Sequence, residues 1–507
     1  MKVAKRLIYS LLIGLAVGAV VAALSPGVFW RGWLAAGFLS WLSAFFLWSV
    51  WSWAGAGKTL AWMVVLAFLL RLGVGMAVSL ALPVYGHDEP TQKAGYLFFD
   101  AYKRDQESWG MVLSKSSFID ALYMEFDTDQ YGGLLVLSGM VYSYLSPDAH
   151  RPFLVLILGA FTAALGVPFF WRAVRQRWNI SLANLAGWIL VSYPDGIFFG
   201  ASQMREPFLI GLSCVAFWAV VEWAHKKREA ILAFMLSTAG MAVFSSRVFL
   251  AVMAVLAVWF WLEYLLPCSK AWRIAGILGL IVAGLGLLFV IGDWLRSVAW
   301  YDLRLTVLDS GRWQEALNQI QGWMKPPVLI GYGLTQPVLP AAIAYPTVWI
   351  WKVIAILRAA GWYALAPFLL YAVYTSFKIQ VPADRRVLLW SAIAVMIWII
   401  VSSARAGGDQ WDNPRYRTLF LPWMALLTAW AVQHALATRD LWLVRWLLVE
   451  AIFLAYFTHW YFTRYFQWSG RMPFWRMIAW ILGLSALVLS SGWLWDAWRW
   501  WRKRRSQ

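Results

Sequence analysis

The acidic side chains best placed to act as a general base follow the third long apolar segment of the chain. That segment ends in the turn His87-Asp88-Glu89, and a long polar interval comes after it. Adjacent carboxylates repel each other, which raises the pKa of one of them, and a carboxylate at a low-dielectric boundary is a usable general base. The alternative is a solvated turn that merely ends a helix.

Arg71 and Arg205-Glu206 are charged positions that interrupt or open apolar segments. An arginine at the centre of a membrane helix costs about 2.5–3.5 kcal/mol on insertion scales, so Arg71 should face the bundle interior and meet a carboxylate or a phosphate. An internal ion pair is its structural alternative. Glu206 suits a first helical turn, where the helix dipole favours a carboxylate. Its functional alternative is a partnership with Asp88, either direct or through a divalent cation.

Further arginines suited to phosphate lie at other helix ends, at Arg247 and in the run Asp412-Asn413-Pro414-Arg415-Tyr416-Arg417. The planar guanidinium forms paired, charge-assisted hydrogen bonds with phosphate oxygens. Anchoring of lipid headgroups is the alternative for any single one of them. Together with the carboxylates, these side chains indicate chemistry on a phosphate-bearing substrate.

The elements that must position these residues are membrane helices. The chain has 507 residues, of which 62% are hydrophobic and 13% charged, whereas soluble proteins have about 25% charged residues. We therefore expect an all-α, polytopic transmembrane helical bundle. Fourteen segments have spanning length, near residues 7–24, 33–53, 60–83, 152–171, 182–200, 206–224, 230–247, 249–266, 274–292, 361–377, 388–403, 417–435, 441–461 and 475–494.

Charge and cysteine content exclude several other classes. The net charge of +18 comes from short basic clusters between apolar segments, as the positive-inside bias places them, so it does not indicate nucleic acid. Cys214 and Cys268 have no metal-ligand spacing and indicate neither a zinc site nor a disulfide framework. The 39 tryptophans fit a chain that crosses many membrane interfaces.

The basic clusters also predict the topology. If they are cytoplasmic, both termini are inside and the interval 84–131 is outside, provided that 132–146 does not span but lies in or re-enters the outer leaflet. The exterior interval then carries nine carboxylates: Asp88, Glu89, Asp100, Asp105, Glu107, Asp120, Glu125, Asp127 and Asp129. We expect two N-terminal helices in 1–59, a catalytic membrane module in 60–292 with an exterior loop at 84–151, an exterior loop with an amphipathic segment in 293–360, and C-terminal helices in 361–507.

The order of these features resembles the C-type (GT-C) glycosyltransferase superfamily, in particular relatives of the protein O-mannosyltransferases and aminoarabinose transferases. The resemblance rests on Arg71 before Asp88-Glu89, an amphipathic exterior helix pair, Arg151-Pro152 opening a span, a Tyr193-Pro194 turn, and Arg205-Glu206. Asn413-Pro414-Arg415-Tyr416 before Leu421-Pro422 is similar to a pattern in late helices of bacterial members. The resemblance covers residues 60–225 best, and two further helices precede the family's first.

This resemblance implies a membrane enzyme of the cell envelope. It implies transfer of a sugar from a polyprenyl-phosphate donor to a hydroxyl of a glycan, lipid or protein acceptor, with inversion, at the outer face of a plasma membrane. Asp88 would be the base, with Glu89 and Glu206 catalytic beside it. His87, Arg71, Arg205, Arg247, Arg415 and Arg417 would bind substrate, and whether a divalent cation is used stays open.

Three other functions stay open on the sequence. One is an outer-leaflet polysaccharide polymerase or ligase that works through exterior arginines. Another is a lipid-linked-sugar flippase or other transporter, although polar residues on one side of the membrane favour an enzyme over a transporter. The third is a non-catalytic membrane subunit, in which Asp88 and Glu206 would not share a cavity.

Overall fold

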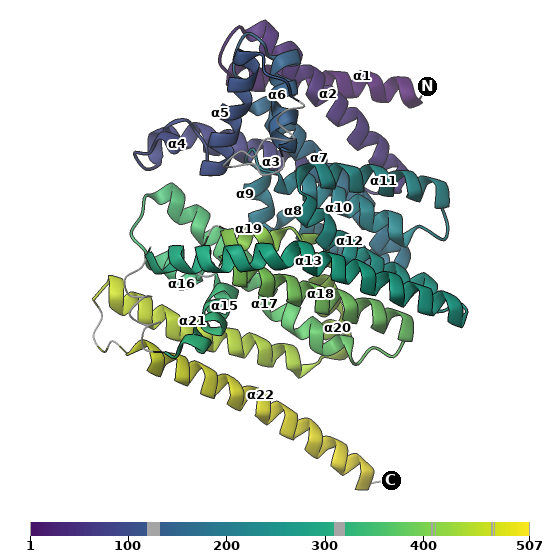
Figure 1. The fold of residues 1–507 in the computed structure, drawn as a ribbon, viewed down its shortest axis with the longest axis vertical. Coiled ribbons are helices and arrows are strands. Elements are labelled where there is room, and N and C mark those ends of the chain that lie inside the picture. Colours follow the sequence, from purple (N-terminus) through teal and green to yellow (C-terminus); the bar gives the residue numbers. More distant parts are fainter. Residues whose placement is uncertain are drawn as a thin grey trace. The chain divides into compact units, whose positions relative to one another are not determined.

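The computed structural model describes residues 2–118, 132–308, 320–406, 409–410, 412–467, 470 and 472–505. Within these residues the regular elements are helices, as expected from the sequence (Figure 1). The acidic positions 120, 125, 127 and 129 of the expected exterior loop lie outside them. Contacts within the chain divide it into two compact units: Met1–Val298 with Arg415–Leu426, and Ala299–Pro414 with Leu427–Gln507.

Nine helices among the described residues are long and apolar enough to cross a membrane: Ala4–Ala23, Phe29–Ala54, Lys58–Tyr85, Phe153–Arg177, Ser246–Leu265, Trp349–Ser376, Pro382–Ala406, Leu441–Tyr465 and Phe474–Arg499. They lie in α1 (Lys2–Ala23), α2 (Phe29–Ala54), α3 (Lys58–Tyr85), α7 (Phe153–Arg177), α12 (Ser246–Phe260) with η2 (Trp261–Leu265), α17 (Trp349–Ser376), α18 (Pro382–Ala406), α21 (Leu441–Tyr465) and α22 (Phe474–Arg505). The protein is therefore a multi-pass membrane protein.

A tenth crossing is formed if α19 (Asp412–Thr418) and α20 (Leu421–Thr438), which meet at an angle of 75°, count as one span. The bend follows α19 at once, so the helix that carries Arg415 is only seven residues long. The segment 417–435, expected to be one crossing, thus begins at the end of α19 and continues past the bend in α20.

The other segments expected to span are also helical. Their described helices are too short, are broken in two, or do not belong to the nine helices that are long and apolar enough to cross. Residues 182–200 form α8 (Ile180–Ser192) and α9 (Pro194–Gly200), which separate at Tyr193-Pro194 because proline donates no backbone hydrogen bond. α10 (Glu206–Val221) has 16 residues, fewer than the roughly 20 that a crossing needs. Both α11 (Lys227–Phe244) and α13 (Lys270–Leu308) are helical without being among the nine.

Residues 132–146 form α6 (Gly133–Leu145), an apolar helix of 13 residues that is too short to cross. This agrees with the prediction that the segment does not span. Two other helices belong to the expected exterior loop, α4 (Pro90–Lys93) and α5 (Phe99–Ser114).

The centre of the first unit is the pair α7 and α10. All residues of α10 except Leu212 are buried, and α7 contacts α2, α3, α8 and α10. The two helices approach closely at glycines: a Cβ added to Gly211 would lie 2.1 Å from the Thr162 carbonyl oxygen, and one added to Gly166 would lie 2.8 Å from Gly211 Cα. Small residues allow such close backbone contact between membrane helices.

The second unit is held together by aromatic and aliphatic packing. It contains η3 (Gly322–Met324), α15 (Lys325–Thr335) and α16 (Leu339–Ala344) together with the long helices α17, α18, α21 and α22. Its buried cluster joins α16 to α21 and α22 through Ala344, Phe457, Tyr461 and Met477. The charged residues of the candidate functional site, among them Asp100, Glu206 and Arg415, belong to the first unit and not to this one.

Candidate functional site

The main charged feature of the first unit is a buried arginine, Arg415, held between two carboxylates, Glu206 and Asp100. These three residues form the clamp. Arg415 Nε donates to Glu206 Oε1 at 2.6 Å, and Arg415 Nη1 donates to Asp100 Oδ2 at 2.6 Å. Glu206 is the first residue of α10, and Asp100 lies in the first turn of α5. Both carboxylates therefore lie at helix N-termini, where the helix dipole favours negative charge.

The clamp is open to solvent on one side only. The Glu206 and Arg415 side chains are 1% and 7% exposed, whereas the Asp100 side chain is 37% exposed. The second oxygen of Glu206, Oε2, is buried and accepts no hydrogen bond from the part of the chain that the structure describes. An incoming substrate would thus reach the clamp at Asp100.

Two more arginines act on the same carboxylates. Burial alone would raise the pKa of Asp100, but the charges of Arg415, Arg104 and Arg205 together lower it. Arg104 is 2% exposed and its Nη1 donates to the Gln203 carbonyl at 3.4 Å. Arg415 and Arg205 therefore act on both carboxylates, and Arg104 acts on Asp100.

Asp105, next to Arg104 on α5, organises a second buried network. Tyr96 and Tyr142 each donate a hydroxyl hydrogen bond to this carboxylate. His150 Nε2 lies 2.9 Å from Asp105 Oδ2. Burial first, and then the charge of Asp105, raises the pKa of both tyrosines, so their hydroxyls stay protonated and able to donate.

This network ties together the elements around the clamp. The Trp109 and His150 rings are stacked at a centroid distance of 5.2 Å, which joins α5 to the turn before α7. Gln203 Nε2 donates to the Pro152 carbonyl at 2.9 Å, and Gln203 Oε1 accepts from Tyr142 at 3.4 Å. The segment before α10 is therefore held against α6 and the start of α7, and Glu206 follows directly.

The turn singled out in the sequence lies between α3 and α4. Asp88 is 85% exposed and forms an ion pair with Lys93, whose hydrogen bond and charge lower the pKa of Asp88. Glu89 Oε2 accepts from Gln92 Nε2 at 3.2 Å, and the His87 backbone N–H donates to Gln92 Oε1 at 2.6 Å. Among the described contacts none joins Asp88 to Glu206 or Arg415. The described ion pair of Asp88 and the described hydrogen bond of Glu89 are both local.

Arg71 is buried, as expected for a central arginine of a membrane helix; its exposed fraction is 2%. In the described residues its one hydrogen bond runs from Nη1 to the Ala67 carbonyl of the same helix at 3.0 Å, and its Nε has no partner. The side chain packs against α9, where a Cβ added to Gly200 would lie 2.6 Å from Arg71 Cδ. Arg71 was expected to meet a carboxylate or a phosphate; the described residues supply no carboxylate, and the phosphate stays a prediction.

The remaining expected residues fall into two groups. Arg205 immediately precedes α10, and its charge acts on both Asp100 and Glu206. Arg417 is fully buried in α19, two residues after Arg415. Arg247 lies half-buried at the start of α12, in the same unit. Arg205 is therefore connected electrostatically with the clamp, whereas no described contact links Arg247 to it.

Asp100, Arg104 and Asp105 had no assigned role in the sequence, although all three belong to the polar interval. The spacing of Asp100 and Arg104 was the available signal, because residues four apart share a face of a helix. Groups of three or more histidine, cysteine, aspartate or glutamate side chains able to hold a metal do not occur among the described residues.

The comparisons with known proteins leave the family open. No protein-family model matches the chain, and a comparison with curated proteins finds no match. The structure shows a polytopic helical membrane protein whose first unit contains a carboxylate–arginine cluster.

Proposed function

We propose that the protein is a glycosyltransferase that moves a sugar from a polyprenyl-phosphate donor to an acceptor hydroxyl, with inversion, at the outer face of the membrane. The observation that carries the proposal is the cluster in which Arg415, Arg104 and Arg205 surround Asp100 and Glu206. Guanidiniums suit a phosphate-linked substrate because they form paired, charge-assisted hydrogen bonds with phosphate oxygens. The finer assignment to the C-type superfamily, its fourteen crossings and the exterior orientation belong to this proposal.

In the proposed reaction the acceptor oxygen bonds to the anomeric carbon and loses its proton to a carboxylate. The bond between the anomeric carbon and the phosphate oxygen breaks, and its electron pair stays on the phosphate. Arg415 stabilises the charge that the phosphate gains, together with Arg205 and the buried Arg71 and Arg417. An alcohol is a poor nucleophile until a base takes its proton, so one carboxylate must lie at the acceptor.

Asp88 is the base that the family resemblance implies. It is exposed and ionised beside Lys93, so an acceptor hydroxyl has to displace Lys93 to reach it. Its lowered pKa makes it a weak base while the ion pair persists, and exchange of Lys93 for a neutral hydroxyl raises that pKa toward its ordinary value.

Asp100 is the alternative base. A donor phosphate that takes Arg415 Nη1 releases Asp100, while Glu206 keeps its hydrogen bond to Arg415 Nε. Loss of the guanidinium removes the largest influence that lowers the pKa of Asp100, and burial then raises it. Donor binding would in this way produce the base that the displacement needs.

Transfer assays with a polyprenyl-phosphate-linked, radiolabelled sugar test the proposal in proteoliposomes. Asp88→Asn or Asp100→Asn, whichever removes the base, should lower the rate by about 10²–10⁴-fold. Arg415→Ala should abolish transfer, and Glu229→Gln, which removes an exposed carboxylate paired with Lys226, is the matched control. Full activity in both aspartate variants combined with loss in Arg415→Ala would favour a polymerase or ligase. Movement of the lipid-linked sugar across the bilayer with its bonds intact would establish a flippase.

A further inference from the structure

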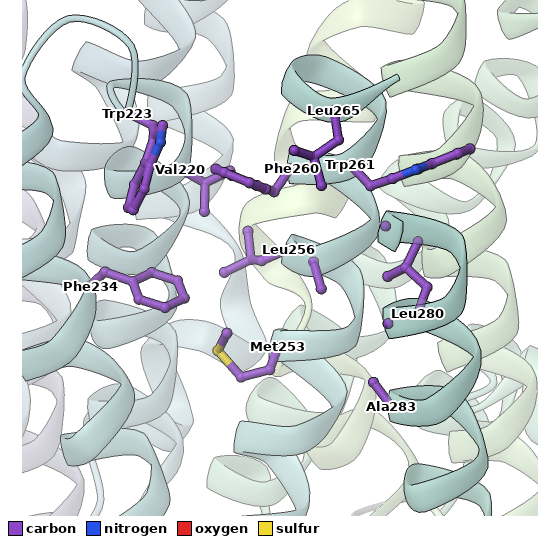
Figure 2. A pocket seen from close by; sticks show the side chains of 13 residues that line it. Val220, Trp223, Phe234, Met253, Leu256, Phe260, Trp261, Leu265, Leu280 and Ala283 are labelled. Atoms are coloured by element: carbon purple, nitrogen blue, oxygen red, sulfur yellow. The ribbon is translucent and has the colours of Figure 1, made fainter. Parts of the chain in front are cut away.

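An apolar cavity of about 410 Å³ lies in the first unit at the end of α10 that is remote from Glu206 (Figure 2). Its volume is within the range of about 300–1,000 Å³ that ligand sites occupy. The lining comes from α10 and the turn after it, α11, α12, η2 and α13: Val220, Trp223, Phe234, Met253, Leu256, Ala257, Phe260, Trp261, Leu265, Gly276, Gly279, Leu280 and Ala283. No charged side chain contributes to it.

The cavity has two distinct ends. Figure 2 shows Trp223 and Leu265 at one end and Met253 and Ala283 at the other. Trp223 and Trp261 lie where α10 and α12 finish, and amphipathic indole rings of this kind settle at headgroup depth in a bilayer. The Trp261 Nε1 donates to the Arg273 carbonyl at 3.3 Å, which fixes this end against the start of α13.

Exposed cations flank the tryptophan end on both sides. Lys227 and Arg228 follow Trp223, and Lys270 and Arg273 precede Gly276; all four are exposed. The nearby carboxylates are already engaged by other cations: Glu222 by Arg172 at 3.2 Å, Glu263 by Arg177 at 3.2 Å, and Glu229 by Lys226 at 3.0 Å. The tryptophan end therefore carries an excess of positive charge.

α13 forms one side of the cavity, and its apolar surface is largely exposed. Many apolar side chains of α13 are exposed, among them Leu278, Val282 and Leu285 at 58%, 70% and 61%. A helix with such a surface is solvated by acyl chains in a membrane. η2, a π-helical turn, lines the cavity, and such turns are frequent at functional sites.

We propose that this cavity binds one acyl chain of an anionic bilayer phospholipid, whose headgroup phosphate lies among Lys227, Arg228, Lys270 and Arg273. The apolar lining fits the chain, the tryptophans fit the glycerol level, and the four cations fit the anionic headgroup. The site is separate from the clamp, since α10, which reaches from Glu206 to Val221, connects the two; it does not depend on the proposed transferase activity.

Native mass spectrometry of the full chain, released from micelles with added lipid, tests the site. We expect one phosphatidylglycerol to be retained in preference to phosphatidylcholine. Ala283→Phe fills the cavity and should remove the retained lipid, whereas Leu285→Phe, on the exposed face of the same helix, should not. Ala257→Phe provides a second filling variant from α12, should one of them fail to fold.

The double variant Lys270→Gln/Arg273→Gln tests whether these cations bind the lipid headgroup. It should weaken phosphatidylglycerol binding roughly 30-fold and remove the preference over phosphatidylcholine. Lys5→Gln/Lys58→Gln removes the same charge elsewhere in the unit and should leave binding unchanged. Wild-type retention by folded Ala283→Phe and Ala257→Phe, or equal binding of the two phospholipids by the unmodified protein, would overturn the proposal. So would displacement of the phospholipid by polyprenyl phosphate at equal concentration, because the cavity would then hold the donor's tail.

Discussion

Arg415 and Glu206 are 209 positions apart in the chain, yet Nε of the first lies 2.6 Å from Oε1 of the second in the buried interior of one unit. Two charges this well buried are stable only as a pair, because each would otherwise lose its hydration without compensation. The pair therefore joins α19 to the beginning of α10, and Asp100 extends it to α5.

Removing one member of this pair should destabilise the protein more than removing both. Arg415→Met leaves Glu206 buried without a partner and should lower the unfolding free energy by about 3–5 kcal/mol. The double variant Arg415→Met/Glu206→Leu should regain part of that loss. Thermal unfolding in micelles measures both, and Glu229→Gln is the exposed control. A single variant as stable as the unmodified protein would contradict the burial of the pair.

Asp100 should make stability depend on pH in the acid range. Its pKa in the folded protein is lowered, so its contribution to stability is fully present above the ordinary value of about 3.9 and is lost as the pH falls through the lower, folded value. The difference in melting temperature between the unmodified protein and Asp100→Asn should therefore shrink below about pH 4. A difference that stays constant from pH 7 down to pH 3 would contradict this assignment.

Gly211 should tolerate no side chain, whereas Gly159 should. A Cβ at Gly211 would lie 2.1 Å from a backbone oxygen of α7, while a Cβ at Gly159 would make ordinary contact at 3.5 Å with Pro207 Cγ. Gly211→Ala should therefore cost about 1–3 kcal/mol by overpacking, and Gly159→Ala should be near neutral. Thermal unfolding of the two variants gives the comparison, and equal melting temperatures would show that the helices separate at no cost.

The predicted orientation can be checked with the native cysteines. Cys268 is exposed and lies beside the basic cluster expected in the cytoplasm, whereas Cys214 is buried. A membrane-impermeant maleimide should leave Cys268 unlabelled in intact cells and label it in inverted vesicles. Ser116→Cys in a Cys268→Ser background, on the exposed segment after α5, should show the reverse. Labelling of Cys268 from outside would invert the proposed topology.

Helix positions were largely predictable because apolar length and flanking charge are local properties. The sequence located α3, α7 and α21 near their observed positions, and the burial of Arg71 follows from the cost of a charge in lipid. Fourteen crossings are not shown among the described residues, because hydropathy does not register the break at Pro194 or the early end of α10. Fourteen apolar segments thus yield nine long helices, or ten with the bent pair, in the described residues.

The partners of the charged residues were not predictable in the same way. Glu206 and Arg415 were both singled out, but their pairing depends on helix packing across most of the chain. Asp100 looked like one of many loop carboxylates until α5 placed it beside Arg415. Asp88 was expected to be a base, and its ion pair with Lys93, five residues on, was not predicted. Its catalytic role stays a prediction.

The separation of Glu206 and Arg415 also affects how the protein is made. The ribosome adds Arg415 209 residues after Glu206, so the Glu206 carboxylate gains this guanidinium only after several membrane helices have been made. Arg205, whose charge already acts on Glu206, is the neighbour available during that interval. Chains that end before residue 415 lack the hydrogen-bonding partner of Glu206, so the clamp can form only late in synthesis.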